Sequence, residues 1–166
     1  QECGSNNIQP IIGSSINLLD IREKDKISQI SFLVKNETGY KNLIYLSSIS
    51  YLNKGSDIGI TIKDLENHSE GLFCFLGGEY NPLMILHNDN KNTDELINIF
   101  KKLFKNNLLF ELQRINDSEI DSFENILIKK SNEFNIPLVG TNNIKFGEQE
   151  EFAAHDALLC VAQKTT

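Results

Sequence analysis

Short apolar runs alternate along this chain with longer segments whose apolar residues recur at helical spacing, and this alternation constrains the fold more than any other feature. Such a pattern is typical of β-α units around a parallel sheet. It predicts an α/β fold with mainly parallel strands and outer helices. Strands are expected at Ile8 to Gly13, Ile27 to Val34, Gly71 to Leu76, Leu108 to Gln113 and Pro137 to Gly140.

One intervening segment has a clear helical start and an apolar stripe. Thr93 can cap a helix, and Asp94 and Glu95 follow in the first turn, where the helix dipole favours acidic side chains. The later apolar residues recur at spacings of three and four, which places them on one face. They are Leu96, Ile99, Phe100, Leu103 and Phe104.

Three further segments are predicted to be helical. The first begins at the cap candidate Ser118 and ends at Asn135, a residue type that tolerates the left-handed conformation at helix ends. The other two cover Thr38 to Tyr51 and Glu148 to Val161. The charged stretch Asp20 to Lys26 interrupts the pattern and is typical of a hairpin tip or loop.

Length and charge limit what the chain can be. Its 166 residues, 40% of them hydrophobic, suit one domain with a sizeable core. There are 16 basic and 23 acidic residues, so the formal net charge is −7. Because such a surface repels a phosphate backbone, direct DNA binding by this segment alone is not expected.

The cysteines indicate the cellular compartment, and the first residues indicate whether the sequence is part of a longer polypeptide. Cys3, Cys74 and Cys160 are an odd, scattered set, which favours reduced thiols in the cytoplasm over a disulfide framework. No apolar run approaches the roughly 20 residues that cross a bilayer. The first residues include neither an initiator methionine nor a leader. We therefore expect a segment of a longer cytoplasmic polypeptide, with no membrane partner.

The residues that follow the predicted strands decide the function, because functional groups in a parallel barrel project from the carboxyl ends of its strands. These positions hold Ser14 and Ser15, Gly77 and Gly78, Arg114 to Asn116, and Thr141 to Lys145. Divalent metals prefer carboxylates and neutral imidazoles, and almost none occur here. The sequence therefore predicts a barrel mouth with almost no side chains that can bind a divalent metal.

Five separated motifs carry a resemblance to a known family. They are Pro10 to Gly13, Lys35 to Leu43, Glu111 to Arg114, Ile136 to Asn142 and Ala154 to Cys160. In this order they resemble the N-terminal PHP (polymerase and histidinol phosphatase) domain of bacterial replicative DNA polymerase III alpha subunits. The resemblance implies a partial, distorted (β/α)7 barrel.

The same resemblance implies where this segment belongs. Residues 1–166 would be a PHP domain fragment that lacks the family's first strands, with the polymerase palm, fingers and C-terminal domains outside it. The parent would be a DNA-directed DNA polymerase, a nucleotidyltransferase for DNA replication, with Mg in a site outside the segment. The segment itself would hold no cofactor. Its partners would be the rest of the polymerase chain and the proofreading exonuclease subunit, and DNA would be bound through the parent.

Six positions depart from the ligand pattern of metal-binding family members. The resemblance implies that these members have a Glu where this chain has Ser15, and a His where it has Gln29. They would have a Cys in place of Gly78 and a His in place of Ile115. The resemblance also implies a carboxylate and an imidazole where the chain has Asn143 and Lys145. None of the replacements supplies an anionic or imidazole ligand. We therefore expect a degenerate, metal-free site without catalytic residues, in a segment that scaffolds the polymerase and docks its exonuclease.

Two other functions stay open at this point. An active metal-dependent PHP phosphoesterase or 3′–5′ exonuclease would require the missing carboxylates and histidines. A small-molecule binder could instead use the barrel mouth around Arg114, Asn142 and Lys145.

The other reactive residue types have structural interpretations. His68, His87 and His155 follow no predicted strand, and structural or solvated roles are expected for them. Gly77 and Gly78 are expected in a tight turn rather than in a phosphate-binding loop. Cys74 lies between two phenylalanines and is expected to be a buried small hydrophobe.

Overall fold

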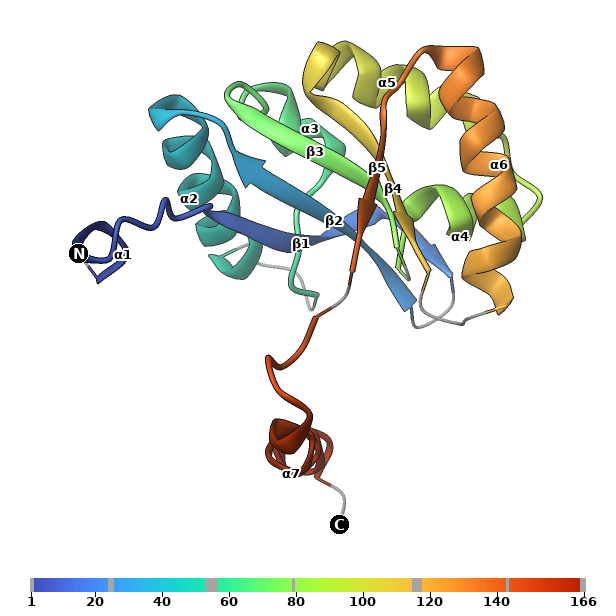
Figure 1. Ribbon diagram of the computed structural model, residues 1–166. Helices are drawn as coiled ribbons and strands as arrows, with labels where there is room; N and C mark the ends of the chain where they lie inside the picture. The colour runs from blue at the N-terminus through green and yellow to red at the C-terminus, as the bar shows by residue number, and fades with distance from the viewer. Residues whose placement is uncertain are drawn as a thin grey trace.

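The computed structural model describes residues 2–23, 26–52, 57–78, 80–114, 118–142 and 144–164. Five strands form a single sheet, with helices packed against it (Figure 1). The strands are β1 (Gly13–Glu23), β2 (Lys26–Val34), β3 (Leu72–Gly77), β4 (Leu108–Gln113) and β5 (Leu138–Thr141). The α-helices are α1 (Glu2–Ser5), α2 (Glu37–Leu52), α3 (Ile62–Glu66), α4 (Pro82–Asn88), α5 (Asp94–Phe104), α6 (Ser118–Phe134) and α7 (Phe152–Gln163). Two short 3-10 helices are η1 (Lys105–Asn107) and η2 (Gln149–Glu151).

The sheet is mixed, in the order β1-β2-β3-β4-β5. β2 is antiparallel to both β1 and β3, whereas β4 is parallel to both β3 and β5. The α/β class is therefore confirmed, but the prediction of mainly parallel strands is wrong for the first half of the sheet. The reason is the hairpin that joins β1 directly to β2, because adjacent strands in a hairpin must run in opposite directions. Across the described residues the sheet is open, with β1 and β5 at its two edges.

The first strand differs most from the sequence-based prediction. The prediction of a strand from Ile8 to Gly13 is wrong, since β1 begins at Gly13 and continues through Ser14 and Ser15. The preceding segment holds Pro10, which has no N–H to donate, and its side chains are exposed. The alternation that places Ile16 and Leu18 in the core instead belongs to β1.

The charged stretch after these residues forms the expected hairpin, although less of it is loop than predicted. Asp20 belongs to β1, and Glu23 still pairs with Lys26 at the start of β2. The connection itself, at positions 24 and 25, lies outside the described residues.

Alternate residues of the sheet enter one hydrophobic core. In β2 and β3 these are Ser28, Ile30 and Phe32, and Leu72, Cys74 and Leu76, all of them buried. They share the core with side chains from α2, α4, α5 and α6. The intervening residues Gln29, Ser31, Phe73 and Phe75 are exposed or half-buried. The helices therefore cover one face of the sheet more completely than the other.

Helix α5 confirms its prediction, with two differences in detail. Phe100 and Phe104 are buried, and Phe104 stacks on Phe32 of β2 at a centroid distance of 5.8 Å. Thr93 occupies the N-cap position but makes no capping bond with its side chain. Asn92 caps the helix instead, because its Oδ1 accepts a hydrogen bond from the Asp94 N–H at 2.9 Å.

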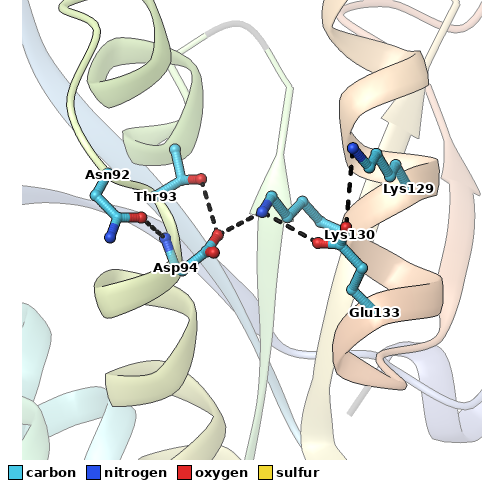
Figure 2. A network of polar contacts seen from close by, with 6 residues as sticks. All are labelled: Asn92, Thr93, Asp94, Lys129, Lys130 and Glu133. Atoms are coloured by element: carbon cyan, nitrogen blue, oxygen red, sulfur yellow. Dashed lines mark hydrogen bonds and ion pairs between the residues drawn. The ribbon is translucent and has the colours of Figure 1, made fainter.

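Helix α6 begins at Ser118 as predicted, and Asn135 just beyond it has a φ of 50°, the expected left-handed exit. Lys130 joins this helix to the start of α5, since its ammonium contacts the carboxylates of both Asp94 and Glu133 (Figure 2). The hydrogen bond to Asp94 is the main cause of a raised Lys130 pKa. The contact with Asp94 links the two helices, whereas the contact with Glu133 lies within α6.

Two glycines let α2 approach β3. A Cβ on Gly39 would lie 1.8 Å from the carbonyl oxygen of Gly71, so no larger residue fits without a backbone shift. Gly71 has a φ of +74°, a region that other residues rarely adopt. The Asn36 side chain accepts a hydrogen bond from the Gly39 N–H at 3.0 Å and so fixes the first turn of the helix.

Candidate functional site

Two of the six positions predicted to have lost the family's metal ligands, Ser15 and Gln29, share one pocket. They lie within strands β1 and β2, not at strand exits, so the prediction that Ser14 and Ser15 follow a strand is wrong. In the sheet, Ser15 pairs with Ser31, and Asn17 pairs with Gln29. The pocket has a volume of about 270 Å³. It is lined by Ser14, Ser15, Ile16, Asn17, Gln29, Ser47, Ser50, Tyr51 and Ile58.

The polar side chains of this pocket make hydrogen bonds to neighbouring side chains and to backbone carbonyls. The hydroxyls of Ser15 and Ser31 are 2.8 Å apart, and the Gln29 Nε2 donates to the Asn17 Oδ1 at 3.2 Å. The Asn17 Nδ2 in turn donates to the carbonyl of Ile58 at 2.9 Å. None of the described residues that line the pocket has a charged side chain. These residues therefore suit a neutral hydrogen-bonding group and offer no carboxylate or imidazole for a divalent cation.

Gly78, the third predicted position, has a backbone role at the end of β3. Its φ is +78°, and an added Cβ would meet the Gln113 side chain at 3.1 Å. At the preceding residue, Gly77, a Cβ would lie 2.0 Å from the carbonyl oxygen of Glu111. Gly77 lies within β3, so the predicted turn is wrong for it, and close approach to Glu111 explains this glycine. Gly78 follows the strand with a positive φ, which agrees with the predicted turn.

A second polar cluster lies where the parallel strands end, and the sequence-based site prediction did not include it. Glu111 is 9% exposed, and its Oε1 accepts hydrogen bonds from the Thr141 hydroxyl at 2.5 Å and from the Gln113 Nε2 at 3.0 Å. The signal in the sequence was a charged residue directly after the buried Phe110. What the sequence does not reveal is the register that places Thr141 on the same face. Among the described residues, this cluster offers one carboxylate and no imidazole.

Of the remaining predicted positions, the structure describes only Lys145, which joins neither cluster. Lys145 is exposed, and Ile115 and Asn143 lie outside the described residues. Arg114 forms a bidentate ion pair with Glu124 of α6, at 2.7 and 2.9 Å. The hydrogen bond from Arg114 is the main cause of a lowered Glu124 pKa. Arg114 therefore holds β4 to α6, which weakens the case for a small-molecule site built on it.

The three histidines make aromatic contacts. His68 stacks on Tyr45 with the ring centroids 3.9 Å apart. His87 and His155 lie against Phe123 and Phe146 at 5.6 and 5.5 Å. These contacts agree with the structural roles predicted for them.

Cys74 is fully buried, and its burial raises the pKa of the thiol, which confirms its prediction as a small hydrophobe. Across the described parts of residues 2–164, no three His, Cys, Asp or Glu side chains come together in a group that could hold a metal ion. In the same parts, no helix is long and apolar enough to span a membrane.

Comparisons with known proteins place these features in a family. The family model of the PHP domain matches residues 1–115. The chain is 34% identical to DNA polymerase III subunit alpha of Rickettsia bellii, over 96% of this chain and 14% of that protein. It is 35% identical to DNA polymerase III subunit alpha of Borreliella burgdorferi, over 97% of this chain and 15% of that protein.

A third relative, DNA polymerase III subunit alpha of Campylobacter jejuni, is 32% identical over 98% of this chain and 15% of its own length. The chain thus spans about one seventh of the curated relatives it matches. Because the family model covers more than half of the 166 residues, the chain belongs to the PHP domain family.

Proposed function

We propose that this chain is part of a replicative DNA polymerase III alpha subunit, a cytoplasmic nucleotidyltransferase, and that within it the PHP fold serves as a metal-free scaffold that docks the proofreading exonuclease. In this proposal the fragment lacks the family's first strands and does no chemistry of its own. The polymerase palm, with its Mg site, the fingers and the C-terminal domains lie outside it.

The observation that carries the proposal is the donor set of the shared pocket. Ser15 and Gln29 line the same pocket, and their described neighbours there are three serines, one asparagine, one tyrosine and two isoleucines. A hydroxyl or amide oxygen can complete a metal site that has charged ligands, but without a carboxylate the cost of dehydrating a divalent cation is not offset. The acidic net charge of −7 further supports a protein partner over DNA for this segment.

Metal analysis of the full-length subunit tests the metal-free part of the proposal. We expect no stoichiometric Zn, Mn or Fe bound through these residues. A double variant, Ser15→Glu with Gln29→His, serves as the positive control. The two positions are diagonal neighbours on paired strands, within reach of long side chains, so this variant is expected to gain Zn affinity. Stoichiometric metal in the unaltered subunit, with phosphoesterase or 3′–5′ exonuclease activity, would establish the active alternative instead.

A retention assay tests the docking part. The full-length subunit should co-purify with its exonuclease, and removal of residues 1–166 should abolish that association while the polymerase core remains able to bind primed DNA. Equal retention of the exonuclease by the shortened subunit would contradict the scaffold role. The Ser15→Glu and Gln29→His variant should keep the exonuclease, since its changes lie in the pocket.

A further inference from the structure

Helix α7 is apolar over most of its surface. Its twelve residues, Phe152–Gln163, are mainly Ala, Leu, Val, Phe and Cys, and its polar residues are His155, Asp156 and Gln163. A helix with so large an apolar face normally buries that face. The described side chains of α7 are nevertheless exposed or at most half-buried. Val161 is 77% exposed and Leu158 is 65% exposed.

Figure 1 shows α7 set apart from the sheet, beyond the end of β5. Its ordered contacts are local. The Phe146 ring lies against Phe152 and His155, at 6.0 and 5.5 Å. The Glu151 carboxylate accepts hydrogen bonds from the N–H groups of Gly147 and Glu148, and these bonds lower the pKa of Glu151. The helix is thus formed by its own sequence, while its apolar surface is left without a packing partner in the described structure.

The charges near α7 restrict what can cover it. Three glutamates stand at its start, Glu148, Glu150 and Glu151, and no Lys or Arg occurs between residues 146 and 163. An anionic lipid surface would repel this end, because interfacial helices rely on basic residues to bind such membranes. The complementary surface is an apolar groove with basic residues near the helix start.

We propose that α7 docks into such a groove on the remainder of its own polypeptide. The inference rests on the proposed membership of a DNA polymerase III alpha subunit. In the relatives, the matched segment is accompanied by about six times as many further residues, which provide ample surface for the groove. A covalently attached partner is also present at high effective concentration, so a helix of three turns is enough for stable docking.

Hydrogen exchange on the full-length subunit tests this inference. The amides of α7 should be protected, and Leu158→Glu with Val161→Glu should speed their exchange by about tenfold or more. Glu matches Leu in intrinsic helix propensity but opposes the helix dipole near a C-terminus, so the neutral polar variant Leu158→Gln with Val161→Gln must also speed the exchange if docking is what is lost. The matched control, Leu158→Met with Val161→Ile, keeps the surface apolar and should retain the protection.

Three results would overturn the inference. One is fast exchange of α7 in the unaltered full-length subunit. Another is a reading frame that encodes no polypeptide beyond these 166 residues. The third is a dimer of the subunit that the Leu158→Glu and Val161→Glu variant dissociates, since a second copy would then cover the helix. Metal content and exonuclease retention are measured in separate experiments. Failure of the scaffold proposal can therefore be distinguished from failure of the α7 docking inference.

Discussion

The two halves of the sheet hold polar residues in different ways. In the antiparallel half, Ser15, Asn17 and Gln29 line an uncharged pocket and are exposed or half-buried. In the parallel half, Glu111 is buried between Thr141 and Gln113, and the backbone of Gly77 packs directly on that of Glu111. The difference indicates that the parallel half is constrained by packing, whereas the exposed pocket residues Ser15 and Gln29 can change with little cost to the fold.

The largest effect is expected from Gly77→Ala. The new methyl would lie 2.0 Å from the Glu111 carbonyl oxygen, so β3 and β4 must separate locally. We expect a loss of about 3 kcal/mol or more in the free energy of unfolding, measured by denaturant titration. Gly140→Ala in β5 is the matched control, since nothing lies within 4 Å of its added Cβ. Similar losses for both variants would show that the close packing at Gly77 is not what constrains the parallel half.

The next effect is expected from Glu111→Ala. Removal of this buried acceptor leaves the Thr141 hydroxyl and the Gln113 amide without their shared partner. The expected cost is about 1–3 kcal/mol, again measured by denaturant titration. A neutral result would mean that the cluster is no more constrained than the pocket.

The ion pair of Arg114 and Glu124 should affect the pH dependence of stability. The Glu124 pKa is lowered from its ordinary value of 4.5 in the folded state, so the unfolded chain binds the proton more tightly. The stabilisation is therefore present above about pH 4.5 and is lost as the pH falls through the folded-state pKa. Thermal melting between pH 6 and pH 3 should show a shallower acid decline for Glu124→Gln than for the unaltered chain. Parallel declines would show that this pair contributes nothing on the acid side.

The smallest effect is expected from Ser15→Ala. Ser15 is exposed, and its one hydrogen bond to Ser31 faces the solvent-accessible pocket. A change within about 0.5 kcal/mol is expected. A loss as large as that of Glu111→Ala would break the contrast between the two halves.

The four helices that the sequence predicted are present because their signals are local, whereas α1, α3 and α4 were not predicted. Ser118 and Asn135 marked the ends of α6, and the apolar stripe of α5 was visible at spacings of three and four. β2 to β5 were found from short apolar runs. β1 was misplaced because Ile8, Ile11 and Ile12 resemble a strand in composition, although their side chains are exposed to solvent.

The candidate site was only partly predictable, since it depends on register between strands. The resemblance singled out Ser15 and Gln29, and the sheet brings them into one pocket. The Glu111 cluster was missed because its partner Thr141 is thirty residues away. Such contacts arise from the parallel pairing of β4 with β5, which has no signature in local spacing.

The buried thiol of Cys74 can report local opening of the sheet. It lies in β3, the strand shared by both halves, and it is completely covered, whereas Cys3 is exposed and Cys160 is half-buried. Its burial also keeps the sulfur protonated, so a thiol reagent must wait until the central strand is uncovered. The rate of Cys74 modification would therefore measure how often the sheet opens locally, without any added label.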